Sequence, residues 1–434
     1  MPIKELVTKI KQRLGSTSGE AIFKNMFVLL LGTGVARIIN LAAMPVLTRM
    51  YSPEDFGVLA LFTAWVGVLS SVASLRYVVA IQLPKSDKVA INVGVLCILS
   101  ITASATLISL LIWLFSPEIL AMLSMESLLP YVWLVVLAVV GAGAYEVLSN
   151  WSIRKGDFRR VSRTLAWQSL SGVTAKLLLG VLSIKPLGLL IGQIMQQAGG
   201  VLGLYRHAHA GLKTNWRHVN IKTIYLVARY YIDMPKYRLP SQLLLSVSSQ
   251  APLLISAAIF GVEATGQLGL ALMALLMPIE LFGRSAGQAY YAETAKIGKQ
   301  YPDKLLVVTK SVVKRLFLIG LVPTLALFLF GEWFFEIAFG SKWEMAGRLA
   351  SILSIYLLFQ FIASPIVNVL SVINQQSLFL RINLVRAALT AGSLIIPHAL
   401  GLDIYHTVFI YSLTMVAHRA FVYAQIVRAL RRLC

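Results

Sequence analysis

The feature that most constrains this chain is a series of long apolar segments separated by short polar connections. An α-helix rises 1.5 Å per residue, so about 20 apolar residues are enough to cross the hydrocarbon core of a bilayer. Twelve segments of this kind occur near residues 24–48, 57–82, 89–115, 130–151, 164–183, 186–205, 238–259, 266–291, 312–331, 347–373, 378–399 and 404–428. Lipid offers no hydrogen bonds to the backbone, so each segment must bond within itself as a helix. The pattern therefore predicts an all-α integral membrane protein with twelve transmembrane helices.

Composition supports this class. Hydrophobic residues make up 58% of the 434 residues and charged residues only 13%, and the mean hydropathy is +0.77. These values lie outside the range of soluble globular domains. We expect a multi-pass protein of the bacterial inner membrane, with no cleavable leader at its N-terminus.

The distribution of basic residues predicts the topology. With both termini in the cytoplasm, 29 of the 39 Lys and Arg fall in cytoplasmic segments and six fall within helices. Only Arg49, Lys185, Lys342 and Arg348 fall outside. This is the positive-inside bias. It accounts for the net charge of +21 through anionic membrane lipids as partners, and it removes the need for nucleic acid.

The longest polar connection divides the chain. We expect a basic N-terminal arm at 1–23, a six-helix bundle at 24–205, a cytoplasmic connection at 206–237 and a second six-helix bundle at 238–434. Apolar residues recur at helical spacing in the arm, so it is compatible with an amphipathic helix on the membrane surface. A frayed basic tail is the alternative.

A weak internal repeat relates the two halves. The stretch "YSPEDFGVLALF" at 51–62 aligns with "FGVEATGQLGLA" at 260–271, and the two share Glu54/Glu263, Gly57/Gly266 and Leu59/Leu268. Six helices per half is an even number, so the halves enter the membrane in the same sense, as parallel repeats do. Two bundles rocking against each other are typical of a transporter; the alternative is chance similarity between apolar sequences.

Nothing in the sequence indicates a cofactor, a metal site or an enzyme. The two cysteines, Cys97 and Cys434, form no CxxC motif, and the six histidines do not share one predicted helix at ligand spacing. No Walker motif and no nucleophile–base pattern occurs. We expect a protein without a catalytic site.

The sequence also resembles a known family. The stretch "LGTGVARIINLAAMPVLTRMYSPEDFGVLALFTAWVGVLSSVASLRY" at 31–77 is similar to the first two helices of the oligosaccharide flippases of the polysaccharide-transporter group. The stretch "YYIDMPKYRLPSQLLLSVSSQAPLLISAAIFGVEATGQLGLALMALLMPIELFG" at 230–283 resembles their seventh and eighth helices. The resemblance implies the MATE-like fold of the multidrug/oligosaccharidyl-lipid/polysaccharide (MOP) exporter superfamily. It also implies movement of undecaprenyl-pyrophosphate-linked sugar units across the inner membrane.

Charged residues inside the predicted helices are the candidate site. A charge at the bilayer centre costs roughly 3 kcal/mol, so such residues normally face protein or water. The basic ones are Arg37, Arg76, Lys176, Arg284, Arg386 and Arg419. The acids at similar depth, Glu146 and Glu280, are possible coupling or structural groups. The excess is cationic and is spread over both halves.

The candidates differ in their surroundings. Arg37 is nearest mid-membrane and shares one helix face with Thr33 and Asn40, so we expect this stripe to bind substrate. Its polar members could instead join helices to each other. Arg76 and Lys176 lie nearer helix ends, where a long side chain can reach the interface. Arg284 follows Glu280 at i,i+4, so an ion pair is as compatible as a ligand contact.

The cations predict an anionic substrate. Guanidinium groups bind phosphate through paired, charge-assisted hydrogen bonds and stay protonated. This chemistry suits an alternating-access flippase that moves undecaprenyl-pyrophosphate-linked repeat units to the periplasmic leaflet for O-antigen, capsule or exopolysaccharide assembly. A polysaccharide polymerase and chain-length proteins are expected partners.

Two other functions remain open. A cation-coupled multidrug antiporter on the same fold would need buried acids, of which only Glu146 and Glu280 are available. A membrane polysaccharide polymerase or ligase would need a large periplasmic loop, whereas the long connections here are basic and cytoplasmic. The sequence does not specify the glycan, the pathway, the energy coupling or the oligomeric state.

Overall fold

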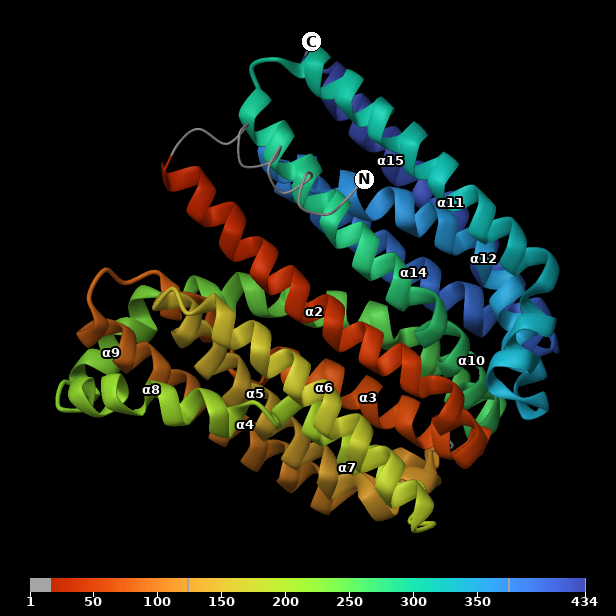
Figure 1. Cartoon of the computed structure of the whole chain (residues 1–434), viewed down its shortest axis with the longest axis horizontal. Coiled ribbons are helices and arrows are strands. Elements are labelled where there is room, and N and C mark those ends of the chain that lie inside the picture. Colours follow the sequence, from red (N-terminus) through yellow and green to blue (C-terminus); the bar gives the residue numbers. More distant parts are fainter. Residues whose placement is uncertain (1–16, 123–124, 374, 434) are drawn as a thin grey trace, which may run out of the picture.

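The computed structural model describes residues 17–122, 125–373 and 375–433, and helices account for nearly all of them (Figure 1). Within these ranges no β-strand occurs, so the all-α fold is confirmed. The expected arm at 1–23 lies mostly outside the described residues. The first described helix, α2, begins at Thr17.

The chain forms two sets of helices in sequence order. The first set comprises α2 (Thr17–Met50), α3 (Pro53–Ala73), the 3-10 helix η1 (Tyr77–Gln82), α4 (Asp87–Met122), η2 (Glu126–Tyr131), α5 (Val132–Arg154), α6 (Phe158–Val181), α7 (Leu187–Ala198), α8 (Val201–Trp216) and α9 (Ile221–Tyr230). The second comprises the π-helical turn η3 (Met234–Arg238), α10 (Leu239–Ile297), α11 (Pro302–Phe339), η4 (Ser341–Trp343), α12 (Glu344–Ile366), α13 (Val369–Val372), α14 (Gln376–Ala399) and α15 (Ile404–Arg431).

Local side-chain chemistry sets several helix ends. Ser52 and Asp55 form a capping box at the start of α3, in which each side chain accepts from the other residue's backbone N–H at 3.2 and 2.9 Å. Asp403 caps α15 by accepting from the His406 N–H at 2.9 Å. Gly298 and Gly340 follow α10 and α11 with φ of 72° and 103°, which lets the chain leave both helices.

The helices differ from the predicted spans in two places. The segment predicted at 57–82 leaves the α-helix after Ala73, because Leu75 and Arg76 adopt positive φ. The span predicted at 186–205 is divided into α7 and α8. The spans predicted at 238–259 and 266–291, by contrast, are the two helical arms of α10, which meet at a kink at Gly261 (φ 82°, ψ 177°).

In the described part of the chain, nine helical stretches are long and apolar enough to cross a membrane. The segments holding α6 and α15 are not among them; α6 carries Arg159, Arg160, Arg163 and Lys176. The chain is therefore a multi-pass membrane protein, while the count of twelve spans and the cytoplasmic termini stay predictions. The structure also places the greater part of α8 and all of α9 within the predicted connection at 206–237.

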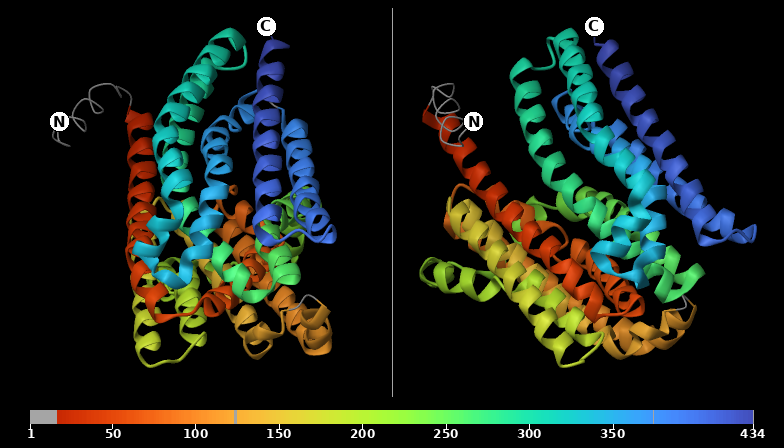
Figure 2. Two further views of the ribbon diagram at one scale, coloured as in Figure 1. Left: turned by 90° about the vertical axis from the view of Figure 1, so that its right-hand side faces the viewer. Right: turned by 45° about the vertical axis from the view of Figure 1, so that its right-hand side comes forward.

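The helices pack as two bundles that touch at one end and diverge toward the other (Figures 1 and 2). The first bundle is α2–α9 and the second is α10–α15, with α3 against α10 as the main contact between them. Helix α2 lies on the side of the first bundle that faces α10 and α11. The basic turns between α5 and α6 and between α10 and α11 lie at the diverging end (Figure 1).

A glycine pair forms the closest approach between the bundles. A Cβ on Gly266 would lie 1.8 Å from the Pro53 carbonyl oxygen, and one on Gly57 would lie 2.0 Å from the Val262 carbonyl oxygen. Any larger residue would push α3 away from α10. These two glycines are the pair aligned in the internal repeat, so the related segments of the two halves pack against each other.

Side chains around the glycine pair complete the contact. The Trp343 Nε1 donates to the Thr48 carbonyl at 3.0 Å, and its ring packs edge-on against Phe56 at 5.0 Å. Arg49 donates to the Ile337 and Ala338 carbonyls at 3.0 and 2.8 Å, near the C-terminal end of α11, where a cation is favourable. The bundles are thus joined at the end that carries the α2–α3 turn and the α11–α12 connection.

Candidate functional site

Polar side chains, several of them buried, gather in two clusters, one in each bundle. The amide cluster in the first bundle consists of Asn40, Ser169, Lys176, Gln193 and Gln196. The arginine cluster in the second bundle consists of Ser248, Ser249, Tyr356, Arg386, Tyr411 and Arg419.

Lys176 lies at the centre of the amide cluster and is only 6% exposed. Its Nζ donates to the Gln193 Oε1 at 3.0 Å and to the Gln196 Oε1 at 3.2 Å. Among the described residues, no carboxylate lies within 4.0 Å of it. The charge of Lys176 is thus met by amide dipoles rather than by an acid.

Close helix packing brings the amides to Lys176. A Cβ on Gly172 of α6 would lie 2.6 Å from the Gly192 carbonyl oxygen, and a Cβ on Gly192 of α7 would lie 2.6 Å from that of Gly172. Gln193 and Gln196 follow Gly192 on α7 and reach Lys176 across this contact. The two glycines therefore let α6 and α7 approach closely enough for the glutamines to reach Lys176.

Asn40 joins the amide cluster to α2. The Gln196 Nε2 donates to the Asn40 Oδ1 at 2.6 Å, and the Asn40 Nδ2 donates to the Ser169 Oγ at 3.2 Å. Arg37 precedes Asn40 by three residues, lies on the same face of α2 and is half-buried. The stripe predicted on this helix thus adjoins the cluster.

Arg386 and Arg419 form the core of the arginine cluster. The Arg386 Nε donates to the Ser248 Oγ at 3.0 Å, and its Nη2 donates to the Ser249 Oγ at 3.3 Å. Arg419 is 8% exposed, and its buried Nε has no hydrogen-bond partner. The two arginines lie on the packed helices α14 and α15, and in the described part of the chain neither has a carboxylate within 4.0 Å.

Aromatic groups lie beside these arginines. The rings of Tyr356 and Tyr411 pack edge to face with centroids 5.7 Å apart, and Tyr411 neighbours both guanidinium groups. Elsewhere on α12, Gln360 has a buried Oε1 without a hydrogen-bond partner among the described residues.

Arg76 lies apart from both clusters. Its Nη1 is 3.6 Å from the Glu146 Oε1, which makes an ion pair between the α3–η1 turn and α5. A φ of 62° turns the chain at Arg76. The position of this pair fits a structural role for Glu146, one of the two roles expected for it.

Arg284 and Glu280 belong to α10, but their side chains lie outside the described part of the structure. Their ion pair stays a prediction. Sequence reasoning missed Gln193, Gln196, Ser248, Tyr356 and Tyr411. A possible signal was the i,i+3 spacing of Gln193 and Gln196 on an otherwise apolar helix.

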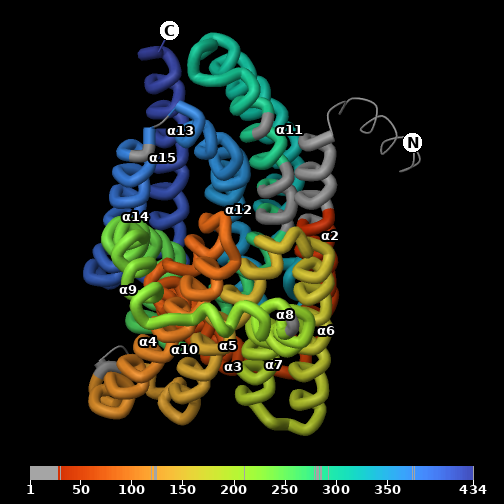
Figure 3. The backbone as a smooth tube through the Cα atoms, turned by 90° about the vertical axis from the view of Figure 1, so that its left-hand side faces the viewer, coloured from red at the N-terminus to blue at the C-terminus, as the bar shows by residue number. Residues whose placement is uncertain are grey.

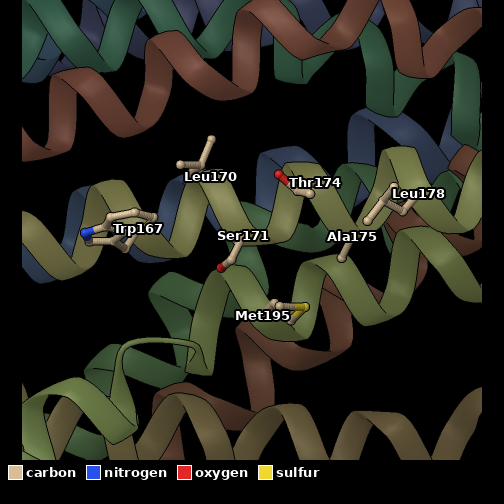
Figure 4. Close-up of a pocket in the computed structure, with 7 residues that line it drawn as sticks. All are labelled: Trp167, Leu170, Ser171, Thr174, Ala175, Leu178 and Met195. Carbon is tan, nitrogen blue, oxygen red and sulfur yellow. The ribbon is translucent and has the colours of Figure 1, made fainter.

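The outer face of α6 and α7 carries a shallow groove of about 320 Å³ (Figure 4). Its lining consists of Trp167, Leu170, Ser171, Thr174, Ala175, Leu178 and Met195. In Figure 4, Ser171 and Met195 meet between the two helices, while Trp167 and Leu178 lie toward its ends. No charged side chain lines the groove, so it is not part of the cationic site.

Comparison with known proteins gives a family and a fold. A family model described as "Polysaccharide biosynthesis protein" matches residues 46–348. No curated protein sequence matches the chain.

Solved transporter structures share the fold. A lipid II flippase, MurJ, in an inward closed conformation aligns with a TM-score of 0.67 at 13% identity, covering 94% of this chain and 90% of that one. A mutant of the Vibrio cholerae MATE transporter VcmN gives 0.57 at 14% identity, covering 95% and 97%. A MOP superfamily transporter from Pyrococcus furiosus gives 0.56 at 15% identity, covering 95% and 96%. The predicted MATE-like fold is confirmed.

Proposed function

The chain belongs to the family of polysaccharide biosynthesis proteins. From this membership and from the amide and arginine clusters, we propose that it is a lipid-linked oligosaccharide flippase. It moves undecaprenyl-pyrophosphate-linked repeat units from the cytoplasmic to the periplasmic leaflet of the bacterial inner membrane. The product is a surface polysaccharide such as O-antigen, capsule or exopolysaccharide.

The pair Arg386 and Arg419 carries this proposal. Arg419 is buried and Arg386 is half-buried, and neither has a carboxylate within 4.0 Å in the described part of the chain, so their like charges are unfavourable in the empty protein. A diphosphate would neutralise both and would accept their paired N–H groups. The cost of burying the two arginines is therefore offset when an anion binds.

The amide cluster fits the sugar part of the same substrate. Amide groups both donate and accept hydrogen bonds, as sugar hydroxyl groups require. Asn40, Gln193 and Gln196 are held in place by their contacts with Ser169 and Lys176. The first bundle thus supplies glycan contacts and the second supplies diphosphate contacts, while the polyprenyl chain stays in lipid.

The arrangement of the bundles supports loading from the cytoplasm. The bundles diverge at the end that carries the basic turns near Arg159 and Lys299 (Figure 1). By the positive-inside rule this end faces the cytoplasm. With this orientation the glycine and Trp343 contacts close the periplasmic end, and we assign the arrangement to an inward-open state.

The two rival functions require different residues. A cation antiporter would need an acid free to bind a cationic substrate, whereas Glu146 is 3.6 Å from Arg76. The family match and the solved relatives concern polysaccharide biosynthesis and transport, which favours a transporter over a polymerase or ligase.

Substitution of the arginines tests the proposal. We expect Arg386→Ala and Arg419→Ala to reduce flipping of an undecaprenyl-pyrophosphate-linked oligosaccharide in proteoliposomes by about 100-fold, the loss expected when a buried charged contact is removed. Arg386→Lys should retain part of the activity, because it keeps the charge but not the paired donors. Arg37→Ala should likewise stop surface polysaccharide formation in cells, with partial rescue by Arg37→Lys.

The matched control is Arg381→Ala, which removes an exposed arginine from the same helix as Arg386. It should leave flipping unchanged. Normal flipping by the Arg386→Ala and Arg419→Ala variants, present in the membrane at equal amounts, would refute the proposed site.

A further inference from the structure

Helix α9 is fastened across the end of the first bundle by its inner face. The Asn92 Nδ2 of α4 donates to the His218 carbonyl at 3.0 Å, and its Oδ1 accepts from the Asn220 N–H at 3.0 Å. Ile224 and Val227 are buried beneath the helix. These contacts fix which side of α9 faces outward.

The outer face of α9 is apolar and cationic at once. Ile221, Tyr225, Leu226 and Tyr230 are 73%, 64%, 62% and 79% exposed, and Lys222 and Arg229 are exposed as well. At 100° per residue these six side chains cover one half of the helix, with the two cations in the middle and apolar residues on both sides. We call these six residues the α9 outer face.

The chain segment that carries this face is basic. From residue 158 to residue 232 the chain has no Asp or Glu, while Lys213, Arg217, Lys222 and Arg229 lie on or next to α8 and α9, and Asp233 follows three residues after Tyr230. The preceding acid, Asp157, is already paired with Arg160 and His207 at 3.1 and 3.0 Å. Asp87, at the start of the neighbouring helix α4, is paired with Arg154 at 3.1 Å. The face is therefore complementary to an anionic surface.

We propose that the α9 outer face is a lipid-binding surface that lies in the head-group layer of anionic phospholipids in the leaflet at the diverging end of the bundles. Tyrosine rings suit this layer, because one end of the ring is apolar and the other bonds water or head groups. The aliphatic residues reach the acyl boundary, and Lys222 and Arg229 bind lipid phosphate. Figure 3 shows α8 and α9 across the end of the first bundle, where such a leaflet surface would lie.

This proposal concerns anchoring and does not depend on the transported substrate. A lipid-bound α9 would hold the first bundle at the membrane surface, since Asn92 ties α9 to α4. The Tyr77 hydroxyl, which donates to the Ala228 carbonyl at 3.2 Å, adds a tie to η1. The second bundle would then be the part that moves when the protein changes between its conformational states.

Fluorescence from a single labelled cysteine tests the proposal. The full chain, with Cys97 and Cys434 replaced by Ala, carries Leu226→Cys labelled with an environment-sensitive fluorophore and is reconstituted into vesicles. One set of vesicles is phosphatidylcholine alone, and the other contains phosphatidylglycerol in addition. Spin-labelled lipids with the nitroxide near the head group are the quenchers.

The matched control is the same label at Lys299→Cys, an exposed position in the α10–α11 turn. We expect quenching by the spin-labelled lipid to be at least about twofold stronger at residue 226 than at residue 299, and stronger with phosphatidylglycerol present. Adding Lys222→Ala and Arg229→Ala should remove the dependence on phosphatidylglycerol.

Two results would overturn the proposal. Equal lipid quenching at residues 226 and 299, with equal quenching by aqueous iodide, would show that the face is in water and open to a soluble partner. Strong lipid quenching that is the same in both kinds of vesicle would show apolar insertion without recognition of anionic lipid. Elution of the variants as a single species by gel filtration verifies that they are folded.

Discussion

At the scale of single residues, the main feature is positive charge inside the bundles without an acidic neighbour among the described residues. Lys176 is held by two glutamine oxygens, and Arg419 lies beside Arg386 with an unsatisfied Nε. Such groups lower stability unless something compensates them. Their presence is best explained by an anion that binds during the working cycle.

Stability measurements can separate this explanation from a structural role. We expect Arg419→Met to raise the free energy of unfolding of the substrate-free protein by about 1 kcal/mol, because it removes a buried charge and its repulsion with Arg386. We also expect undecaprenyl pyrophosphate to stabilise the native protein against heat, and this stabilisation to be lost in the variant. Thermal unfolding in detergent, with and without this lipid, measures both effects.

A fall in the melting temperature of the substrate-free Arg419→Met protein would instead assign Arg419 to the fold. Glu146→Gln serves as a comparison. This change removes the charge of a carboxylate that is already paired with Arg76. It should therefore lower the stability of the protein without changing its response to the lipid.

The sequence could identify charges in helices but not their partners. Arg386 and Arg419 were candidates because a guanidinium in an apolar segment needs a reason to be there, but only the packing of α14 against α15 shows that they are neighbours. Gln193 and Gln196 were missed because uncharged amides in an apolar helix also occur as contacts between helices. The turn at Arg76 was missed because positive φ at a residue other than glycine has no sequence signal.

At the scale of helices, the crossing of α3 and α10 determines how the bundles meet. Gly57 and Gly266 let the two backbones approach closely, and Gln267 fixes the neighbouring connection. Its Nε2 donates to the Lys342 carbonyl at 2.7 Å, and its Oε1 accepts from the Ala346 N–H at 3.0 Å. Trp343 is thereby held against Thr48 and Phe56.

Alanine at the crossing should be poorly tolerated. In Gly266→Ala the new Cβ would lie 1.8 Å from a backbone oxygen, so α3 must move, and we expect a loss of about 1–3 kcal/mol in unfolding free energy. Gly34→Ala, where a Cβ meets nothing within 4 Å, should be neutral or slightly stabilising. Equal melting temperatures for the two variants would show that the crossing is loose.

Helix positions were easier to predict than helix ends. Apolar length locates a span because the hydrocarbon thickness sets it, and α14 (Gln376–Ala399) falls within two residues of the span predicted at 378–399. Ends depend on contacts outside the membrane, so α11 extends from Pro302 to Phe339 around a predicted span at 312–331. The break between the spans predicted at 238–259 and 266–291 falls at Gly261, where a positive φ separates the two arms of α10.

At the scale of the whole molecule, the two bundles are joined at one end and apart at the other (Figure 2). Small contacts at the joined end can convert into large displacements at the far end when bundles move as rigid bodies. The aligned segments at 51–62 and 260–271 lie at the joined end. The internal repeat thus coincides with the point about which the bundles would turn.

Spin labels at the diverging end can follow that movement. We expect the distance between labels at Arg159 and Lys299, one in each bundle, to shorten when undecaprenyl-pyrophosphate-linked oligosaccharide is added, because the anion draws the two bundles together. Labels at Lys85 and Arg159 lie within the first bundle and should keep their distance. Double electron–electron resonance in nanodiscs measures the distance between the labels in both pairs. An unchanged Arg159–Lys299 distance would contradict rigid-body closure.

Each bundle carries positive charge in its cluster, Lys176 in the amide cluster and two arginines in the arginine cluster, and this has a kinetic consequence. Closing the unloaded protein would press like charges toward each other in a medium of low permittivity, whereas a loaded protein carries its own neutralising ion. We therefore expect the empty protein to return to its starting state more slowly than the loaded protein leaves it, unless a small anion from solution binds during the return. The same charges that favour an anionic substrate would thus slow conformational cycling, and any accompanying ion leak, when no substrate is bound.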